Sequence, residues 1–283
     1  MNRITPLAAA IALSAAGGAH AACATDEEVA AFVAAWEAGT PATALSAGGT
    51  MEDALCAQEK LRAAMEPVAG PVIGYKAGLT SAPAQERFGV SAPLRGLLFR
   101  DMMLEDGASV PERFGAVPLF EADLVLVVGD GAINEATDPA GVMVHVSAVH
   151  PFIELPDLML AEGEPLTGET ITAMAVGPRM GVLGAAIPVE DAAAMTEALG
   201  AMTVRMTAAD GSVLAEAPGA AVLGHPANAV LFLLDAGVTL AEGDLVSVGS
   251  FGPLVPPPQA GGAATVRYEG LPGDPEVSVR FER

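Results

Sequence analysis

Two acidic residues stand on one face of a very apolar stretch of the chain, VPLFEADLVLVVGD at positions 117–130. Side chains on a β-strand alternate between its two faces, so Glu121 and Asp123 point the same way. Burying two like charges without a partner is costly, so a positive group is expected beside them. A third carboxylate, Glu154, lies in another short apolar segment, HPFIELPD. These three side chains could supply oxygen ligands to one divalent cation.

The type of ligand narrows the choice of ion. An all-oxygen set without cysteine favours Mg²⁺ or Mn²⁺, with Ca²⁺ less favoured. The same spacing also fits a solvated strand edge, where the acidic residues simply face water. On spacing alone, both interpretations stay open.

Lysine is rare in this chain, which has Lys60 and Lys76 against 11 arginines. Lys76 follows the apolar strand candidate 72–75. A lysine kept in such a place suggests a role in a site, whereas the plain alternative is a side chain that extends its amine out to water.

The elements that must position these residues follow from sequence periodicity. Helices are expected at 26–38, after the capping pair Thr25 and Glu28, and from Thr50 to just before Pro67. Together they predict a small helical N-terminal lobe. Strands are expected at 72–75, 117–128, 151–155, 171–176, 203–208, 213–216, 244–249, 264–268 and 277–281, with helices near 82–88, 138–147 and 226–237. A majority of strands with few helices between them predicts an α+β fold built on a folded-over, mostly antiparallel sheet.

Composition excludes several classes of protein. With 52% hydrophobic and 17% charged residues in 283, the chain can bury a large core and is not disordered. The net charge of -22 repels nucleic acids and anionic membrane surfaces, so neither is expected as a partner.

The N-terminus predicts export. Residues 1–21 have Arg3 ahead of a short Ala-rich apolar run from about Ile4 to Ala16. Small residues that end in Ala19-His20-Ala21 follow, which is typical of a cleaved signal peptide. We therefore expect a periplasmic or secreted protein that is not held in the membrane after cleavage. The chain has two cysteines, Cys23 and Cys56. In an oxidising compartment they form a disulfide or remain two free thiols, and the sequence does not decide between these.

Several segments together resemble one known family. GYKAGLTS (74–81), GLLFRDM (96–102), FEADLVLVV, FIEL, LGHPANAVLFLL and GDLVSVGSFGPLVP occur in the order and spacing of the 2-keto-4-pentenoate hydratase and 4-oxalocrotonate decarboxylase branch of the fumarylacetoacetate hydrolase superfamily. The resemblance covers roughly residues 25–282. It implies a mixed β-roll at 71–283 behind a helical N-terminal lobe at 22–70, assembled as a homodimer or a higher homo-oligomer.

The resemblance also implies roles for individual residues. The family's metal ligands match Glu121, Asp123 and Glu154, with Asp in place of a second Glu. Lys76 matches a family lysine that binds the substrate carboxylate or positions the attacking water. Asp101, in FRDM, matches a residue that helps as an acid or base or orients one, although an ordinary turn carboxylate is an equally simple interpretation.

One segment departs from the family pattern. Where the hydratases carry N-A-S-x-G, this chain has VGPRMG, so Gly177 and Arg179 replace an asparagine and a serine. Arg179 is then either a surface residue or a substrate-binding clamp for a second carboxylate, which would favour a dicarboxylate substrate.

The implied activity is that of a divalent-metal-dependent lyase acting on a small 2-oxo acid through an enolate, as a hydratase. Decarboxylation, tautomerisation and acylpyruvate hydrolysis are alternatives on the same chemistry. A non-catalytic periplasmic binder of 2-oxo acids is the alternative from another class.

Overall fold

The structure is a computed structural model that describes residues 23–283, so the predicted signal peptide lies outside the described residues. The helices are α1 (Asp26–Ala38), α2 (Met51–Ala69), α3 (Ala82–Phe88), α4 (Pro139–Val144), α5 (Gly168–Ala173), α6 (Ala192–Ala201) and α7 (Asn228–Asp235). The strands are β1 (Val72–Gly78), β2 (Leu94–Phe99), β3 (Met103–Glu105), β4 (Ala108–Pro111), β5 (Glu121–Val128), β6 (Val146–Leu155), β7 (Met180–Leu183), β8 (Ile187–Pro188), β9 (Thr203–Ala208), β10 (Val213–Pro218), β11 (Leu245–Ser247), β12 (Ala263–Glu269) and β13 (Glu276–Glu282). Short 3₁₀ turns include Arg100–Met102 after β2.

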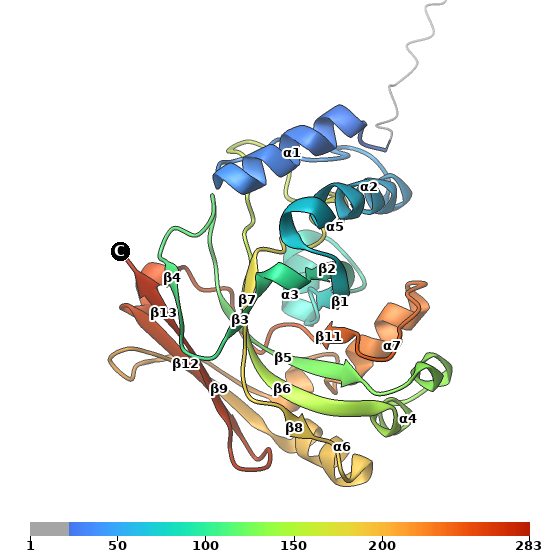
Figure 1. Cartoon of the computed structure of the whole chain (residues 1–283), viewed down its shortest axis with the longest axis vertical. Coiled ribbons are helices and arrows are strands. Elements are labelled where there is room, and N and C mark those ends of the chain that lie inside the picture. Colours follow the sequence, from blue (N-terminus) through green and yellow to red (C-terminus); the bar gives the residue numbers. More distant parts are fainter. Residues whose placement is uncertain (1–22) are drawn as a thin grey trace, which may run out of the picture.

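The strands form two sheets, and α1 and α2 lie together at one end of the molecule (Figure 1). The larger sheet has the order β2-β1-β11-β5-β6-β7-β3, with β8 added to β6, and the smaller sheet has the order β10-β9-β12-β13-β4. The pairs β1–β11, β3–β7 and β4–β13 are parallel, and the other pairs are antiparallel. The predicted α+β class with a mixed β-roll is therefore confirmed.

The main core lies between the two sheets. Leu124 and Leu126 of β5 are fully buried in the same apolar cluster as Val204 and Val266 of the smaller sheet. Because side chains alternate along a strand, the odd-numbered residues of β5 face away from this core. This places the acidic positions of β5 on the opposite face of the larger sheet.

A second apolar core joins the helical N-terminal segment to the larger sheet. Phe32 of α1, Leu61 and Met65 of α2, and Ile171 of α5 pack in one cluster with Leu97 of β2. This cluster attaches the two N-terminal helices to β2, at the edge of the larger sheet.

A disulfide fastens the start of the described chain to α2. Cys23 is bonded to Cys56, 33 residues later, so the alternative of two free thiols does not hold. Among residues 23–283, none of the helices combines the length and the apolar character needed to cross a bilayer.

Two local predictions were wrong, and one helix was missed. The segment 171–176 is not a strand, because α5 runs through its first half behind a capping box at Thr167. A short apolar run does not distinguish a strand from a buried helix. The second helix continues past Pro67 to Ala69, at the cost of the one backbone hydrogen bond that a proline cannot donate. Helix α6 has a weak amphipathic pattern and was not predicted.

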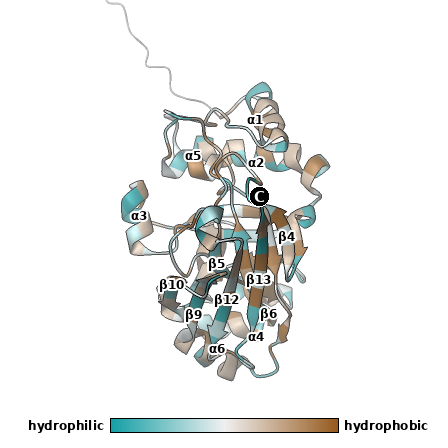
Figure 2. Ribbon diagram, turned by 90° about the vertical axis from the view of Figure 1, so that its left-hand side faces the viewer, coloured by the Kyte–Doolittle hydropathy of each residue, from teal (hydrophilic) through white to brown (hydrophobic). Residues whose placement is uncertain are grey.

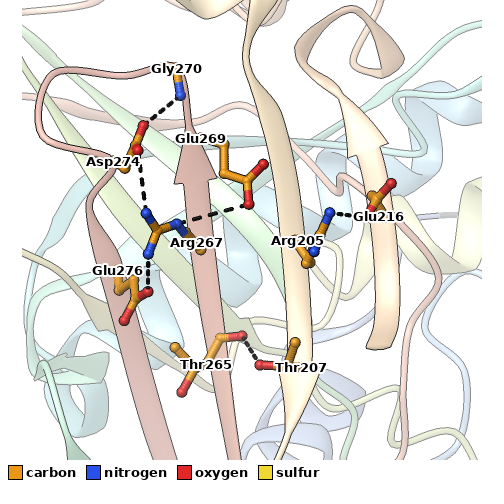
Figure 3. Close-up of polar contacts among 9 residues, drawn as sticks. All are labelled: Arg205, Thr207, Glu216, Thr265, Arg267, Glu269, Gly270, Asp274 and Glu276. Carbon is orange, nitrogen blue, oxygen red and sulfur yellow. Dashed lines mark hydrogen bonds and ion pairs between the residues drawn. The ribbon is translucent and has the colours of Figure 1, made fainter. Parts of the chain in front are cut away.

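The outer face of the smaller sheet is polar. Figure 2 turns this sheet toward the viewer, and Figure 3 shows the ion pairs that cross its strands. Arg205 pairs with Glu216 at 2.8 Å, and Arg267 pairs with Glu276 at 2.9 Å. Exposed pairs of this kind contribute little to stability, and their charged groups make this face of the sheet hydrophilic.

Candidate metal centre

Strands β5 and β6 bring the three predicted ligands together. In their antiparallel register, Glu121 lies opposite Glu154 and Asp123 lies opposite Phe152. Directly opposite residues point to the same face of a sheet, so all three carboxylates share one face. Their nearest ligand atoms lie within 4.8 Å of one another, which is the separation that a single ion can bridge.

Burial makes this group of like charges costly. Asp123 is fully buried, Glu154 is buried and Glu121 is half-buried. Burial, followed by the charges of Glu154 and Asp123, raises the pKa of Glu121 well above its usual value. Burial and the charge of Glu154 also raise the pKa of Asp123 from 3.8 to about 7, although hydrogen bonds to its carboxylate oppose the shift.

Lys76 offsets only part of this charge. Its side chain is buried, and its Nζ donates to Oε1 of Glu154 as an ion pair. With all three carboxylates ionised, as metal ligands are, they and the one ammonium carry two net negative charges in a buried position. A divalent cation has the charge and the oxygen preference that this donor set lacks, so the residues fit such an ion.

The path of the lysine side chain depends on a glycine. Lys76 of β1 lies opposite Gly96 of β2, and a Cβ atom at that position would lie 2.7 Å from Cγ of Lys76. The missing side chain leaves the space that the lysine stem fills, and the Nζ at its end pairs with Glu154. The amine therefore points into the site, and the alternative that it extends out to water does not hold.

The segment at the end of β11 supplies donors to Asp123. The hydroxyl of Ser247 donates to Oδ2, and the backbone N–H of Gly249 donates to Oδ1 at 3.0 Å. Gly249 has a φ of +102°, and a Cβ there would lie 2.4 Å from Oγ1 of Thr80. Only glycine fits this close approach, which aims its N–H at the carboxylate.

Asp101 is not brought to the carboxylate group. It lies in the exposed 3₁₀ turn after β2, and its Oδ1 accepts from Nε of Arg100 at 2.9 Å. The three carboxylates that lie within reach of one ion are Glu121, Asp123 and Glu154, and the exposed Asp101 is not among them. Within the described chain, Asp101 thus has the surroundings of a turn carboxylate, and its catalytic role stays a prediction.

Arg179 binds the protein itself. Its Nε donates to the carbonyl of Phe114 at 2.9 Å, and a second guanidinium nitrogen donates to the carbonyl of Trp36. The guanidinium also lies over the Trp36 ring, 4.4 Å from its centroid, and the indole N–H donates to the carbonyl of Pro178 at 3.0 Å. These contacts tie α1 to the strand that begins at Met180.

His150 is not a fourth ligand of this group. It lies opposite Val125, two rungs from the Asp123 pair, and its Nδ1 is 2.8 Å from the carbonyl oxygen of Gly184. The imidazole thus has a hydrogen-bond partner of its own outside the carboxylate group.

Sequence reasoning missed the residues that support the ligands. Ser247 and Gly249 belong to the quoted GDLVSVGSFGPLVP segment, but no spacing in that segment relates them to Asp123, 124 and 126 residues away. Tyr268 of β12 was also missed. Its buried hydroxyl donates to the backbone carbonyl of Asp123 and accepts from the N–H of Phe152 at 3.0 Å.

The raised pKa of Asp123 predicts an unusual pH dependence of the metal-free protein. A carboxyl group with a raised folded-state pKa stabilises the fold below its unfolded-state pKa and loses that contribution as the pH rises. For Asp123 the loss runs from about pH 4 to about pH 7. Asp123→Asn cannot ionise and keeps acceptor and donor atoms for the same neighbours. In EDTA, its free energy of unfolding relative to wild type should rise by about 3 kcal/mol between pH 4.5 and pH 7.5.

Denaturant unfolding at the two pH values measures this difference. Excess Mg²⁺ should reduce it, because the ion favours the charged form of the wild-type carboxylate. A difference that stays constant with pH would contradict the assignment of Asp123 to a crowded, buried acidic group.

Comparisons with known proteins agree with this fold, although no family model matches the chain. The chain is 32% identical over 204 residues to the 2-keto-4-pentenoate hydratase of Burkholderia vietnamiensis, covering 71% of this chain and 75% of that one. Its fold matches 4-oxalocrotonate decarboxylase from Pseudomonas putida G7, complexed with magnesium and adipate, with a TM-score of 0.72 and 24% identity over 91% of this chain and 98% of that one. Fumarylpyruvate hydrolase from Pseudomonas aeruginosa, in complex with Mn²⁺ and pyruvate, matches with a TM-score of 0.55 and 17% identity over 73% of this chain and 88% of that one.

Proposed function

We propose, from the premise that this chain belongs to the 2-keto-4-pentenoate hydratase family, that it is a divalent-metal-dependent hydro-lyase acting on a small 2-oxo acid. The observation that carries the proposal is the buried group of Glu121, Asp123, Glu154 and Lys76 on one face of the larger sheet. Three acidic oxygens within reach of one ion, next to a buried ammonium, provide the charges that enolate chemistry needs.

Glu121, Asp123 and Glu154 would hold Mg²⁺ or Mn²⁺. When bound, the ion supplies positive charge that stabilises the negative charge developing on a 2-oxo acid. Ser247 and Gly249 hold Asp123 by hydrogen bonds.

Lys76 would contact the substrate or the attacking water in this proposal. Its Nζ is a donor with no acceptor capacity, and it is held on Glu154 inside the site. When a metal ion balances the charge of Glu154, this ammonium is available to a substrate carboxylate or to the oxygen of an attacking water. The apolar surroundings of the site exclude bulk water and strengthen both interactions.

The contacts of Arg179 favour a substrate with one carboxylate. A second carboxylate binds most strongly to a further cation beyond the metal and Lys76, and Arg179 was a residue expected from sequence to serve there. Its guanidinium instead lies over Trp36 and donates to two backbone carbonyls. A 2-hydroxydienoate or 2-oxo-enoate with an uncharged distal end therefore fits better than the substrate of a dicarboxylate decarboxylase.

Replacing Arg179 tests this point. Arg179→Gln should lower the free energy of unfolding by about 1–2 kcal/mol, because it removes hydrogen bonds and a cation–π contact. KM for a monocarboxylate should stay within about twofold. Arg87→Gln is the matched control, since that guanidinium also stacks on an aromatic ring, Phe88, at 5.5 Å. Steady-state kinetics with monocarboxylate and dicarboxylate substrates decide the matter, and a selective rise in KM for the dicarboxylate would restore Arg179 as a substrate clamp.

The reaction is tested by following the enol absorbance of 2-hydroxypenta-2,4-dienoate with and without EDTA. Loss of absorbance only in the absence of EDTA, with the hydrated 2-oxo acid as product, supports the hydratase. Oxaloacetate and acylpyruvates in parallel reactions test decarboxylation and hydrolysis, and enol–keto exchange without water addition identifies a tautomerase. A thermal shift with 2-oxo acids but no turnover of any of them would instead indicate a non-catalytic binder.

We also propose that the protein is exported and forms a homo-oligomer. A signal peptide at residues 1–21 would deliver the protein to the periplasm or outside the cell, and the Cys23–Cys56 disulfide supports an oxidising compartment. Expression with the natural N-terminus, followed by cell fractionation and mass determination, should give a periplasmic chain that begins after Ala21. A full-length chain in the cytoplasm would refute export. Light scattering coupled to size exclusion tests the expected homodimer or higher homo-oligomer.

A further inference from the structure

We propose that Ser247 is a positioning residue for the metal ligand Asp123, holding its carboxylate so that one remaining lone pair points to the ion. The proposal rests on the metal site of the proposed function and adds a residue outside the ligand set. It concerns the orientation of the Asp123 carboxylate and, through it, the affinity of the site for the ion.

The hydrogen bonds of Asp123 account for most of its acceptor capacity. An ionised carboxylate has about four lone-pair positions on its two oxygens. Oδ1 accepts from the backbone N–H groups of Leu124 and Gly249, and Oδ2 accepts from the hydroxyl of Ser247. One position on Oδ2 is left, so the orientation of that oxygen is set by the serine.

The sheet holds the serine itself in place. Ser247 is fully buried on β11, where it lies opposite Lys76 of β1 on one side and Val125 of β5 on the other. Its side chain therefore shares the face of the carboxylates. From there it reaches Asp123, which is two residues from Val125 along β5 and on the same face.

The backbone of Asp123 is held from the opposite side. The hydroxyl of Tyr268 bridges the strands at this rung, donating to the carbonyl of Asp123 and accepting from the N–H of Phe152. With the backbone fixed there, the remaining freedom of the ligand is rotation of its short side chain. Ser247 is the one side chain among residues 23–283 shown donating to that carboxylate, so it restricts this rotation.

Losing such a support usually weakens a metal site without removing it. Hydrogen-bond partners of metal ligands typically change metal affinity by about 10–100-fold when mutated. We expect Ser247→Ala to raise the Kd for Mn²⁺ by a factor in this range. At saturating Mn²⁺, turnover should recover to within about tenfold of wild type, because all three ligands are still present.

The experiment measures Mn²⁺ binding by calorimetry and by the electron paramagnetic resonance signal of free Mn²⁺, using the full mature chain. Ser278→Ala is the matched control, because that hydroxyl also donates to an aspartate, Asp106, at 3.1 Å, but on the smaller sheet. The control should keep the wild-type Kd. Ser247→Cys keeps a donor at this position, although the thiol is larger and donates more weakly, and its Kd should lie between those of wild type and Ser247→Ala.

These measurements separate failure of the proposed metal site from failure of the positioning role of Ser247. Wild-type protein that binds no Mn²⁺ would refute the metal site of the proposed function. Wild-type binding with an unchanged Kd in Ser247→Ala would refute the positioning role alone, even if the melting temperature fell, because a purely structural role lowers stability without changing affinity. Should Ser247→Ala fail to fold, the Kd of Ser247→Cys decides in the same way.

Discussion

Glu121→Gln should abolish metal-dependent turnover while leaving the fold intact. The change keeps the shape of the side chain and removes one of three charges that would hold the ion. Because the ion supplies several kcal/mol of transition-state stabilisation, kcat/KM should fall by about 100-fold or more. In EDTA the variant should be more stable than wild type at pH 7.5, since it relieves the repulsion that raises the pKa of Glu121.

The loss of turnover and the gain in metal-free stability have opposite signs, so a general disruption of the fold cannot produce both. Turnover with and without Mg²⁺ and denaturant unfolding in EDTA measure them separately. Glu276→Gln is the control, because Glu276 is a carboxylate on the exposed face of the smaller sheet, paired with Arg267 at 2.9 Å (Figure 3). Unchanged turnover in Glu121→Gln would refute the site, and lower stability in EDTA would refute the crowding of negative charge.

Lys76→Met should nearly abolish turnover without weakening metal binding. Removing one partner of a buried ion pair costs about 3–5 kcal/mol, so the metal-free variant should unfold at lower denaturant concentration. If the ammonium contacts the substrate or the attacking water, kcat/KM should fall by about 100- to 10,000-fold. The Kd for Mn²⁺ should stay equal or decrease, because the variant loses a positive charge that competes for Glu154.

Lys60→Met is the natural control for this variant, because Lys60 is the other lysine of the chain. Its amine forms an exposed pair with Asp26 at 2.8 Å, and such pairs contribute about 0–1 kcal/mol. Steady-state kinetics and Mn²⁺ titrations should therefore match those of wild type. Turnover of Lys76→Met within about tenfold of wild type would assign the buried lysine to charge balance alone.

The ligand set could be predicted from sequence because it depends on local geometry. Alternation along a strand places Glu121 and Asp123 on one face regardless of the remaining fold. The apolar residues around them indicated burial, and burial of like charges indicated a cation. The α+β class and the first helices followed from similarly local signals, such as the capping pair at Thr25.

Other assignments depended on contacts between distant segments. Arg179 was expected to bind substrate or to be exposed, and its carbonyl partners Trp36 and Phe114 are 143 and 65 residues away. Asp101 lies within the family-like segment GLLFRDM, but there the chain leaves β2 for an exposed turn. The segment after Thr167 has β-branched residues typical of a strand, yet packing on the N-terminal helices makes it a helix.

By itself, the amino-acid sequence determined which residues carry charge into the apolar strands, and that three of them share oxygen chemistry. The tertiary structure decided that Glu154 lies opposite Glu121, that Lys76 pairs with Glu154, and that Ser247 donates to Asp123. The physical reason is that strand alternation acts over two residues, whereas register between strands is set by the packing of the whole sheet.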